Sequence, residues 1–480
     1  MKGAEAGHDD RNGASDARNA TVLATDSRDR EVDGALCASL LRRFRRGWGP
    51  QADPPRHVEK RRLSDLFERR FLIPFCSALI VVEVFAALFL AAGTYGLIVP
   101  LHKPNTTDFV SFYAAGTLAI AGTPERAYDQ AEHYAAEQRA TEIGIDYNFF
   151  YYPPVFLLYC AALARFPYLV SFLIFELMTI IFYLLVTRRI LDEQGWAALL
   201  PVISFPIVFW NFGFGQNAFL TAALFGAGTL YIDRRPLSAG LLLGALCYKP
   251  QFGLLIPIAL AAGRQWRAFG AAFASAAVLC LMSLAAFGWE TWRDFILALS
   301  ASSAVYATGR IPFSGYINAF GAVRQLGGSQ TIAYLVQAGI ALAAAIAVAR
   351  VWRRNVPLPF RAATLASASL LAAPHAMFYD LLLGAVAALW LLRGGGQGRL
   401  LYGEKVALAG LFLLCLTPRS LAESSGLPVG PMIAATLAVL VGMEVFRHRA
   451  PPARTPAPNK RPVRWQANDD GASLPGGVLG

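Results

Sequence analysis

Hydrophobic positions in this chain come in long runs, and short basic clusters separate the runs. The first run, FLIPFCSALIVVEVFAALFLAAGTYGLIV (71–99), is long enough to cross a bilayer as a helix. Residues 1–70 are polar and show no small-residue cleavage site after a short apolar core, so this run is expected to remain as an anchor. Only helices and closed barrels satisfy their backbone groups in lipid, so the pattern predicts an all-α polytopic membrane bundle.

The basic clusters set the expected topology, because cytoplasmic loops carry an excess of Lys and Arg. If the N-terminus is cytoplasmic, the later clusters are expected on the same side: TRR (187–189), DRR (233–235), GRQWR (263–267), RVWRR (350–354), RGGGQGR (393–399) and FRHR (446–449). This assignment predicts about twelve spans and puts both termini inside. The spans are 71–99, 168–187, 196–212, 217–232, 237–249, 251–263, 268–287, 331–350, 361–376, 379–392, 405–418 and 429–446.

Two apolar regions do not fit simple spans. The run at 153–164 is short and begins with two prolines, so we expect it to lie on or dip into the outer leaflet. The run at 237–262 is barely long enough for two helices. This shortness favours broken helices around a water-filled cavity, where irregular backbone is tolerated at membrane depth.

The connections divide the chain into a core and two tails. The segments 100–152 and 288–330 are far longer than an ordinary connection. Both fall on the outer side, and we expect them to be loops that carry short juxtamembrane helices. Residues 1–58 and 450–480 are polar or rich in Pro, Ala, Arg and Asp, which predicts disordered cytoplasmic tails around a transmembrane domain at 59–449.

Composition and charge agree with a membrane location. The chain is 55% hydrophobic and 16% charged, whereas soluble domains carry roughly a quarter charged residues. A net charge of +11 could indicate a nucleic-acid partner. Because the basic residues cluster beside apolar runs, we attribute the charge to membrane topology and expect no nucleic acid. The six cysteines show no paired metal spacing, so neither a zinc site nor a disulfide framework is expected.

Polar residues suited to chemistry all fall at the outer ends of the predicted spans. Loop charges alone assign them to this side, so their convergence predicts one shared cavity at the outer membrane face. They are Asp108, Tyr152, Gln216, Asn217, Lys249, Gln251, Arg310, His375, Tyr379 and Asp380.

Structural interpretations of the same residues stay open. Asp108 could be a solvated loop carboxylate, Lys249 could extend to the lipid interface, and His375 could bond a backbone carbonyl. The mid-span carboxylates Glu83 and Glu176 could be functional, or each could bond a neighbouring helix. The segment GFGQNA fits a loose dinucleotide-binding pattern, but it is flanked by apolar helices rather than by the strand that such a site requires.

The ordered segments DFVSFYAAG, YYPP, GQNAF, YKPQ and APHAMFYD resemble glycosyltransferase family 87 of the GT-C superfamily. These membrane enzymes look like polyprenyl-phosphate-mannose-dependent mannosyltransferases, and the resemblance covers about residues 70–445. It implies transfer of a hexose such as mannose from a polyprenyl-phosphate donor to a lipid or glycan acceptor. The reaction would be an inverting displacement at the outer face of the plasma membrane, with no cofactor besides the donor substrate.

The resemblance also implies roles for the polar set. Asp108 would be the catalytic base, Lys249 and His375 would stabilise the phosphate, and Asp380 would orient His375 and keep it cationic. The superfamily often has paired carboxylates in its first loop, whereas two threonines precede Asp108, which argues against a required metal. Gln216 and Asn217 would bond sugar hydroxyls, and the aromatic rings of FFYY, which include Tyr152, could stack on a sugar ring. The other residues expected to bind substrate are Gln251, Arg310, Tyr379 and Asp380.

Two other functions use similar chemistry. A transporter or flippase of lipid-linked sugars would also have broken helices and polar groups within the membrane, although no internal repeat links the two halves. A ligase or polymerase that moves whole glycans would keep the same donor with a larger acceptor.

Overall fold

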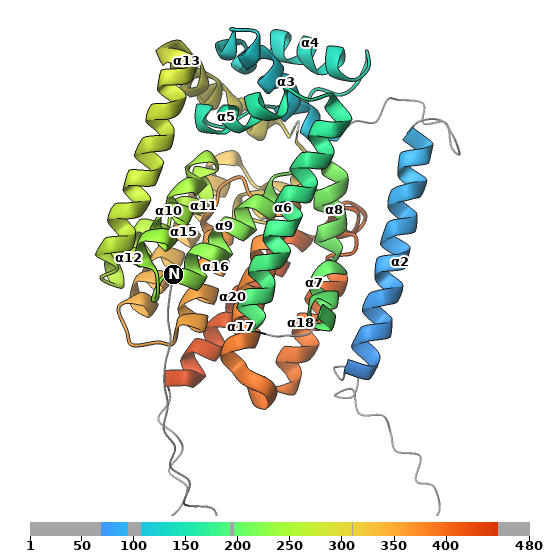
Figure 1. Cartoon of the computed structure of the whole chain (residues 1–480). Coiled ribbons are helices and arrows are strands. Elements are labelled where there is room, and N and C mark those ends of the chain that lie inside the picture. Colours follow the sequence, from blue (N-terminus) through green and yellow to red (C-terminus); the bar gives the residue numbers. More distant parts are fainter. Residues whose placement is uncertain (1–68, 95–106, 193–195, 310, 450–480) are drawn as a thin grey trace, which may run out of the picture. The chain divides into compact units, whose positions relative to one another are not determined.

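The computed structural model describes residues 69–94, 107–192, 196–309 and 311–449, which form helices and no strand (Figure 1). The expected tails at 1–58 and 450–480 and the candidate residue Arg310 lie outside the described residues. The helices are α2 (Arg69–Thr94), α3 (Phe109–Ile120), η2 (Pro124–Tyr128), α4 (Gln130–Ala140), α5 (Pro154–Leu163), α6 (Tyr168–Leu191), η3 (Trp196–Leu199), α7 (Leu200–Ile203), α8 (Pro206–Phe214), α9 (Ala218–Tyr231), α10 (Pro236–Gly244), η4 (Ala245–Tyr248), α11 (Pro250–Gly253), α12 (Ile256–Ala262), α13 (Trp266–Thr308), η5 (Phe313–Gly315), α14 (Ala319–Gln325), α15 (Gln330–Trp352), α16 (Leu358–Ala372), η6 (Phe378–Asp380), α17 (Leu381–Arg399), α18 (Tyr402–Leu414), α19 (Pro418–Ser425) and α20 (Val429–Arg449).

Six helices of the described ranges are long and apolar enough to cross a bilayer, or up to eight if each of two bent pairs is one span. The bent pairs are Ala197–Ile203 with Pro206–Phe214 and Tyr402–Leu414 with Pro418–Ser425. The other four predicted spans are apolar helices of 10–17 residues: Ala218–Tyr231, Pro236–Tyr248, Pro250–Ala262 and Leu358–Ala372. The all-helical membrane architecture is therefore confirmed, whereas the count of about twelve spans and the GT-C type stay predictions.

Proline and glycine explain why these apolar helices are short. The broken helices expected at 237–262 are present: the chain runs through α10, η4, α11 and α12 and leaves the helical conformation at Lys249. A proline opens α10, α11 and α12, because its missing N–H is harmless only in a first helical turn. Among the four predicted spans that are shorter apolar helices, α9 and α16 have most of their residues buried among other helices.

The two long outer connections differ from each other. Between α2 and α6, the described residues carry α3, η2, α4 and α5 as short helices, as predicted. The segment 288–330 was predicted to be a loop that carries short juxtamembrane helices, and its described residues carry the second half of α13, η5 and α14. Helix α13 continues to Thr308 past a kink at Gly288, whose φ of 77° only glycine adopts readily. The second half of α13 packs on α5 and η2, where the rings of Phe295 and Tyr128 are 5.7 Å apart.

Several of the basic clusters contact one another. Arg393 donates to the carbonyl of Arg189 at 3.1 Å, and Arg361 pairs with Asp233 at 2.5 Å. Asp233 also accepts a bond from Gln265 at 3.4 Å. Figure 1 shows α3, α4 and α5 grouped at the opposite end from the start of α13 and the end of α12. Two pairs of the clusters that loop charges assigned to one side of the membrane, 187–189 with 393–399 and 233–235 with 263–267, thus contact each other.

Candidate active site

A cavity of about 680 Å³, here called the Asp108 cavity, collects residues from widely separated parts of the chain. Eight residues singled out in the sequence line it: Asp108, Tyr152, Gln216, Lys249, Gln251, His375, Tyr379 and Asp380. Asn217 is fully buried behind the wall and reaches the cavity through a bond to Lys249. The fold thus brings together residues that lie up to 272 positions apart in the chain.

Asp108 directly precedes α3, and the packing of α3 fixes its position. Phe109 and Phe112, the next residues of this helix turn, are fully buried among aromatic rings from α5 and α6. Gly116 lets α3 lie directly against α5, because a Cβ at Gly116 would come within 2.2 Å of the carbonyl oxygen of Cys160. A larger residue there would push α3 outward and move Asp108 with it.

Gln216 holds the carboxylate of Asp108. Helix α8 ends at Gly215 in the left-handed conformation (φ 64°), which turns the chain so that Gln216 faces α3. The Nε2 group of Gln216 donates to Asp108 Oδ2 at 2.8 Å. The hydroxyl of Tyr152 lies 3.5 Å from Gln216 Oε1, so the amide also links Asp108 to the aromatic segment.

The pKa of Asp108 is raised from 3.8 to about 6. Burial is the largest cause, because it disfavours the charged carboxylate. The hydrogen bond from Gln216 and the charge of Arg419 oppose this effect. Near pH 7 the carboxylate is therefore mostly ionised, and it is a stronger base than an exposed aspartate.

Lys249 is a buried cation with its counter-charge in place. The break between η4 and α11 turns its side chain inward, and only 4% of it is exposed. Its Nζ donates to Asp380 Oδ1 at 2.6 Å and to Asn217 Oδ1 at 3.0 Å. The other oxygen of Asp380 accepts from the backbone N–H of Met377 at 3.0 Å. An ammonium group has three N–H donors, so one remains to face the cavity.

The expected partnership between Asp380 and His375 is not what the geometry provides. The two oxygens of Asp380 accept from Lys249 and from the backbone N–H of Met377 instead. Burial lowers the pKa of His375 from 6.5 to about 4, so its imidazole is neutral near pH 7. The lowered pKa therefore goes against the expectation of a cationic His375.

An aromatic segment, residues 147–152, forms one wall of the cavity. Ser111 Oγ donates to the backbone carbonyl of Phe149 at 3.3 Å. The hydroxyl of Tyr128 donates to the backbone carbonyl of Tyr152 at 2.9 Å. The rings of Phe149 and Tyr151 stack at 5.4 Å, with planes 14° apart. Flat aromatic faces fixed in this way are suited to pack on the apolar face of a sugar ring.

A buried pair behind this wall was not anticipated from the sequence. His133 and Glu137 on α4 are fully buried, with His133 Nδ1 3.7 Å from Glu137 Oε1. His133 Nε2 lies 3.0 Å from the carbonyl oxygen of Ser111, and Glu137 Oε2 accepts from the backbone N–H of Asn148 at 3.2 Å. The pair thus ties α4 to α3 and to the aromatic segment. The only signal in the sequence is the spacing of four residues on a helix.

Arg419 is a second cation of the cavity that the sequence analysis did not single out. It lies at the start of α19, and its Nε donates to Glu423 Oε1 at 2.8 Å. Ser314 Oγ donates to the same oxygen at 2.9 Å. The side chain of Arg419 is 43% exposed, in contrast to that of Lys249. Its position after an apolar run, in LTPRS, was the available signal.

Two further findings concern metals and the mid-span carboxylates. Within the described ranges, no group of three or more His, Cys, Asp or Glu side chains is arranged to hold a metal ion.

Glu83 and Glu176 do not line the Asp108 cavity. Glu176 is fully buried on α6, and neither of its oxygens has a hydrogen-bond partner in the described part of the chain.

Comparison with known proteins gives one family match. Residues 150–374 match the family model of glycosyltransferase family 87. This range includes Tyr152, Gln216, Lys249 and Pro374, and it ends one residue before His375. No curated protein and no solved structure matches the chain.

Proposed function

The chain belongs to glycosyltransferase family 87, and from that premise we propose that it transfers a hexose, such as mannose, from a polyprenyl-phosphate donor to a lipid or glycan acceptor. The donor and acceptor would meet in the Asp108 cavity, on the outer face of the plasma membrane. One observation carries the proposal. A single cavity holds a buried carboxylate with a raised pKa, two cations and a fixed aromatic wall.

In the proposed reaction, Asp108 is the general base. Its carboxylate accepts the proton of the acceptor hydroxyl while the hydroxyl oxygen attacks the anomeric carbon of the donor sugar. The bond from that carbon to the phosphate oxygen breaks, and its electron pair leaves with the polyprenyl phosphate. One displacement inverts the anomeric configuration. Gln216 would hold the carboxylate in line with the incoming hydroxyl, since it donates to Asp108 Oδ2.

The leaving phosphate gains negative charge, so donors must face it. Lys249 has one N–H left after its bonds to Asp380 and Asn217, and its position is fixed before substrate arrives. Arg419 is more exposed and offers a planar guanidinium suited to bidentate phosphate binding. His375, neutral near pH 7, would add a hydrogen bond rather than a charge. Tyr152, Gln251 and Tyr379 are proposed to contact the sugar.

The distribution of basic residues supports the outer location. Two pairs of basic clusters, 187–189 with 393–399 and 233–235 with 263–267, contact each other. Helix α12 ends and α13 begins at the end of the bundle away from α3, α4 and α5. Loop arginines and lysines remain preferentially in the cytoplasm. A cavity formed beside α3 and α5 would then open on the outer side, where polyprenyl-phosphate sugars could enter from the lipid.

The test is sugar transfer by purified protein from a labelled polyprenyl-phosphate mannose. Asp108→Asn keeps an acceptor for the Gln216 bond but cannot take a proton, so transfer should fall by about 10²- to 10⁴-fold with donor binding retained. Asp129→Asn is the matched control. Asp129 also precedes a helix of the same connection, but it caps α4 outside the cavity, and asparagine caps helices equally well. Full activity in Asp108→Asn would remove the base from the mechanism.

A further inference from the structure

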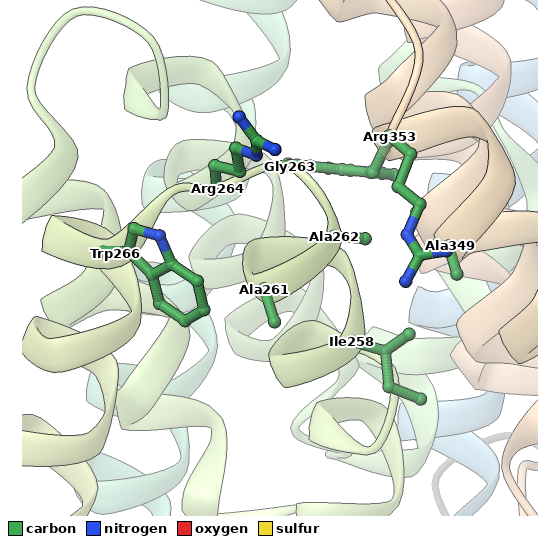
Figure 2. A pocket seen from close by; sticks show the side chains of 9 residues that line it. Ile258, Ala261, Ala262, Gly263, Arg264, Trp266, Ala349 and Arg353 are labelled. Carbon is green, nitrogen blue, oxygen red and sulfur yellow. The ribbon is translucent and has the colours of Figure 1, made fainter.

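A second cavity, of about 730 Å³, lies where α12 ends and α13 begins, next to the end of α15. We call it the arginine cavity. Its lining residues are Ile258, Ala261, Ala262, Gly263, Arg264, Trp266, Ala349, Trp352 and Arg353. Figure 2 shows the side chains of Arg264, Trp266 and Arg353 around the end of α12. The lining thus joins two cations to an apolar floor, and it contains no carboxylate.

The two arginines differ from their basic neighbours. Arg361 and Arg393 at this end of the bundle pair with Asp233 and Asp192. Arg264 and Arg353 are exposed, and neither guanidinium forms a hydrogen bond or ion pair with any other described residue. Two uncompensated cations on one cavity make a site for an anion.

The backbone at Arg264 adds an independent observation. Helix α12 ends with a residue in the left-handed conformation, a position that glycine usually takes. Here Gly263 has an ordinary negative φ of −81°, and Arg264 has φ +54°. An arginine in that conformation is strained. The strained backbone therefore carries a charged side chain that lines the cavity, although a glycine is directly adjacent.

The level of the cavity relative to the predicted membrane favours a lipid over a soluble anion. The candidate spans Trp266–Ser302 and Gln330–Trp352 begin and end at it, so it lies where a span meets its loop. Trp266 is 63% exposed, and tryptophan favours the headgroup level of a bilayer. Ile258, Ala261 and Ala349 supply apolar surface on which an acyl chain could lie.

We propose that the arginine cavity binds an anionic membrane lipid, with Arg264 and Arg353 on the headgroup phosphate and Trp266 beside the start of the acyl chain. The site is separate from the Asp108 cavity, and it does not depend on the transfer reaction. A zwitterionic headgroup would bring a quaternary ammonium toward the arginines, which disfavours it. A free phosphate would leave the apolar floor exposed to water.

The test uses the full-length protein in neutral detergent, with lipid retention followed by native mass spectrometry. Phosphatidylglycerol should be retained more strongly than phosphatidylcholine. Each of Arg264→Gly and Arg353→Gln should weaken retention of phosphatidylglycerol about fivefold, and the pair about 25-fold, since a basic residue near an anionic surface contributes about that factor. Because glycine relieves the strained turn, Arg264→Gly should melt no lower than the unmodified protein, so weaker retention could not be attributed to unfolding.

The matched controls are Arg267→Gln and Arg354→Gln, which remove exposed arginines that do not line the cavity. They should retain phosphatidylglycerol as the unmodified protein does. Equal losses in the controls would mean general attraction to a basic surface and would overturn the proposal. So would undiminished retention in the double variant of Arg264 and Arg353. If inorganic phosphate at the same concentration displaced the lipid, the site would be a phosphate site and the lipid assignment would be wrong.

Discussion

Lys249 in the Asp108 cavity is 4% exposed and bonds Asp380 at 2.6 Å, whereas Arg264 and Arg353 in the arginine cavity are exposed and have no partner among the described residues. The contrast follows from access to water. A buried charge needs a partner in the protein, because nothing else solvates it. An exposed charge is solvated by water and needs no partner in the protein before a ligand binds. The Asp108 cavity is therefore organised before substrate arrives, and the arginine cavity is completed by what binds there.

The carboxylates of the Asp108 cavity show the same rule. Asp380 has a cation and a backbone N–H as partners. Asp108 has the neutral amide of Gln216 at its Oδ2 and only a longer-range charge from Arg419. The first carboxylate is held by an ion pair, whereas burial raises the pKa of the second, Asp108, to about 6. The difference separates a positioning residue from a candidate base within one cavity.

The largest effect should come from breaking the buried ion pair. Lys249→Met leaves Asp380 buried without its cation, which typically costs about 3–5 kcal/mol of stability. Arg353→Gln removes an exposed cation and should change stability by no more than about 0.5 kcal/mol. Unfolding in detergent under increasing denaturant measures both. Combining Lys249→Met with Asp380→Asn should recover much of the loss, since no unpaired charge remains. Equal stability of Lys249→Met and Arg353→Gln would contradict the comparison.

A somewhat smaller effect, of opposite sign, is expected at Asp108. Its pKa in the folded protein is raised from 3.8 to about 6. A carboxyl group with a raised pKa destabilises the fold when ionised, so stability is lost as the pH rises from about 4 through 6. Asp108→Asn should therefore be more stable than the unmodified protein at pH 8, by at most about 3 kcal/mol. The difference should vanish near pH 4. Melting curves at pH 4 and pH 8 test this prediction. If Asp108→Asn were less stable than the unmodified protein at pH 8, ionised Asp108 would not destabilise the fold.

The smallest effect concerns the pH dependence of transfer. If ionised Asp108 is the base, kcat/KM should fall about tenfold for each pH unit below about 6, because only the ionised form accepts a proton. A variant of Glu137 serves as a control for the midpoint of this pH profile of kcat/KM. Burial raises the pKa of Glu137 to about 8, so it is neutral near pH 6. Glu137→Gln should then leave the midpoint near 6, although it weakens the attachment of α4. A flat profile between pH 5 and 7 would exclude Asp108 as the base.

Much of the fold could be read from the hydrophobic pattern. Apolar runs of membrane length can only be helices in lipid, so the all-helical architecture followed from their lengths. The break near Lys249 was visible because prolines punctuate a run too short for two spans. The predicted end of a span at residue 287 coincides with the kink at Gly288. Glycine, followed by charged residues, usually begins a loop, but Gly288 with positive φ bends a helix that then continues.

The residues of the candidate site were also visible in the sequence, because polar side chains beside apolar runs are rare and costly. Loop charges assigned them to one side of the membrane, and eight of them line one cavity. Their partners were not visible. Lys249 and Asp380 lie 131 positions apart and Gln216 and Asp108 lie 108 apart, and nothing local connects either pair. His375 was expected to be cationic, and burial makes it neutral.

The sequence by itself determined the helices, their apolar surfaces, the segregation of basic clusters and the identity of the polar residues, because each depends on local composition and on the solvent around the chain. Only the tertiary structure decided which charge is neutralised and which remains available. That outcome depends on burial and on partners from distant helices. The protonation of Asp108, the ion pair of Lys249 and the unpaired arginines of the second cavity therefore follow from packing, which fixes how far each charge lies from water and from its counter-charge.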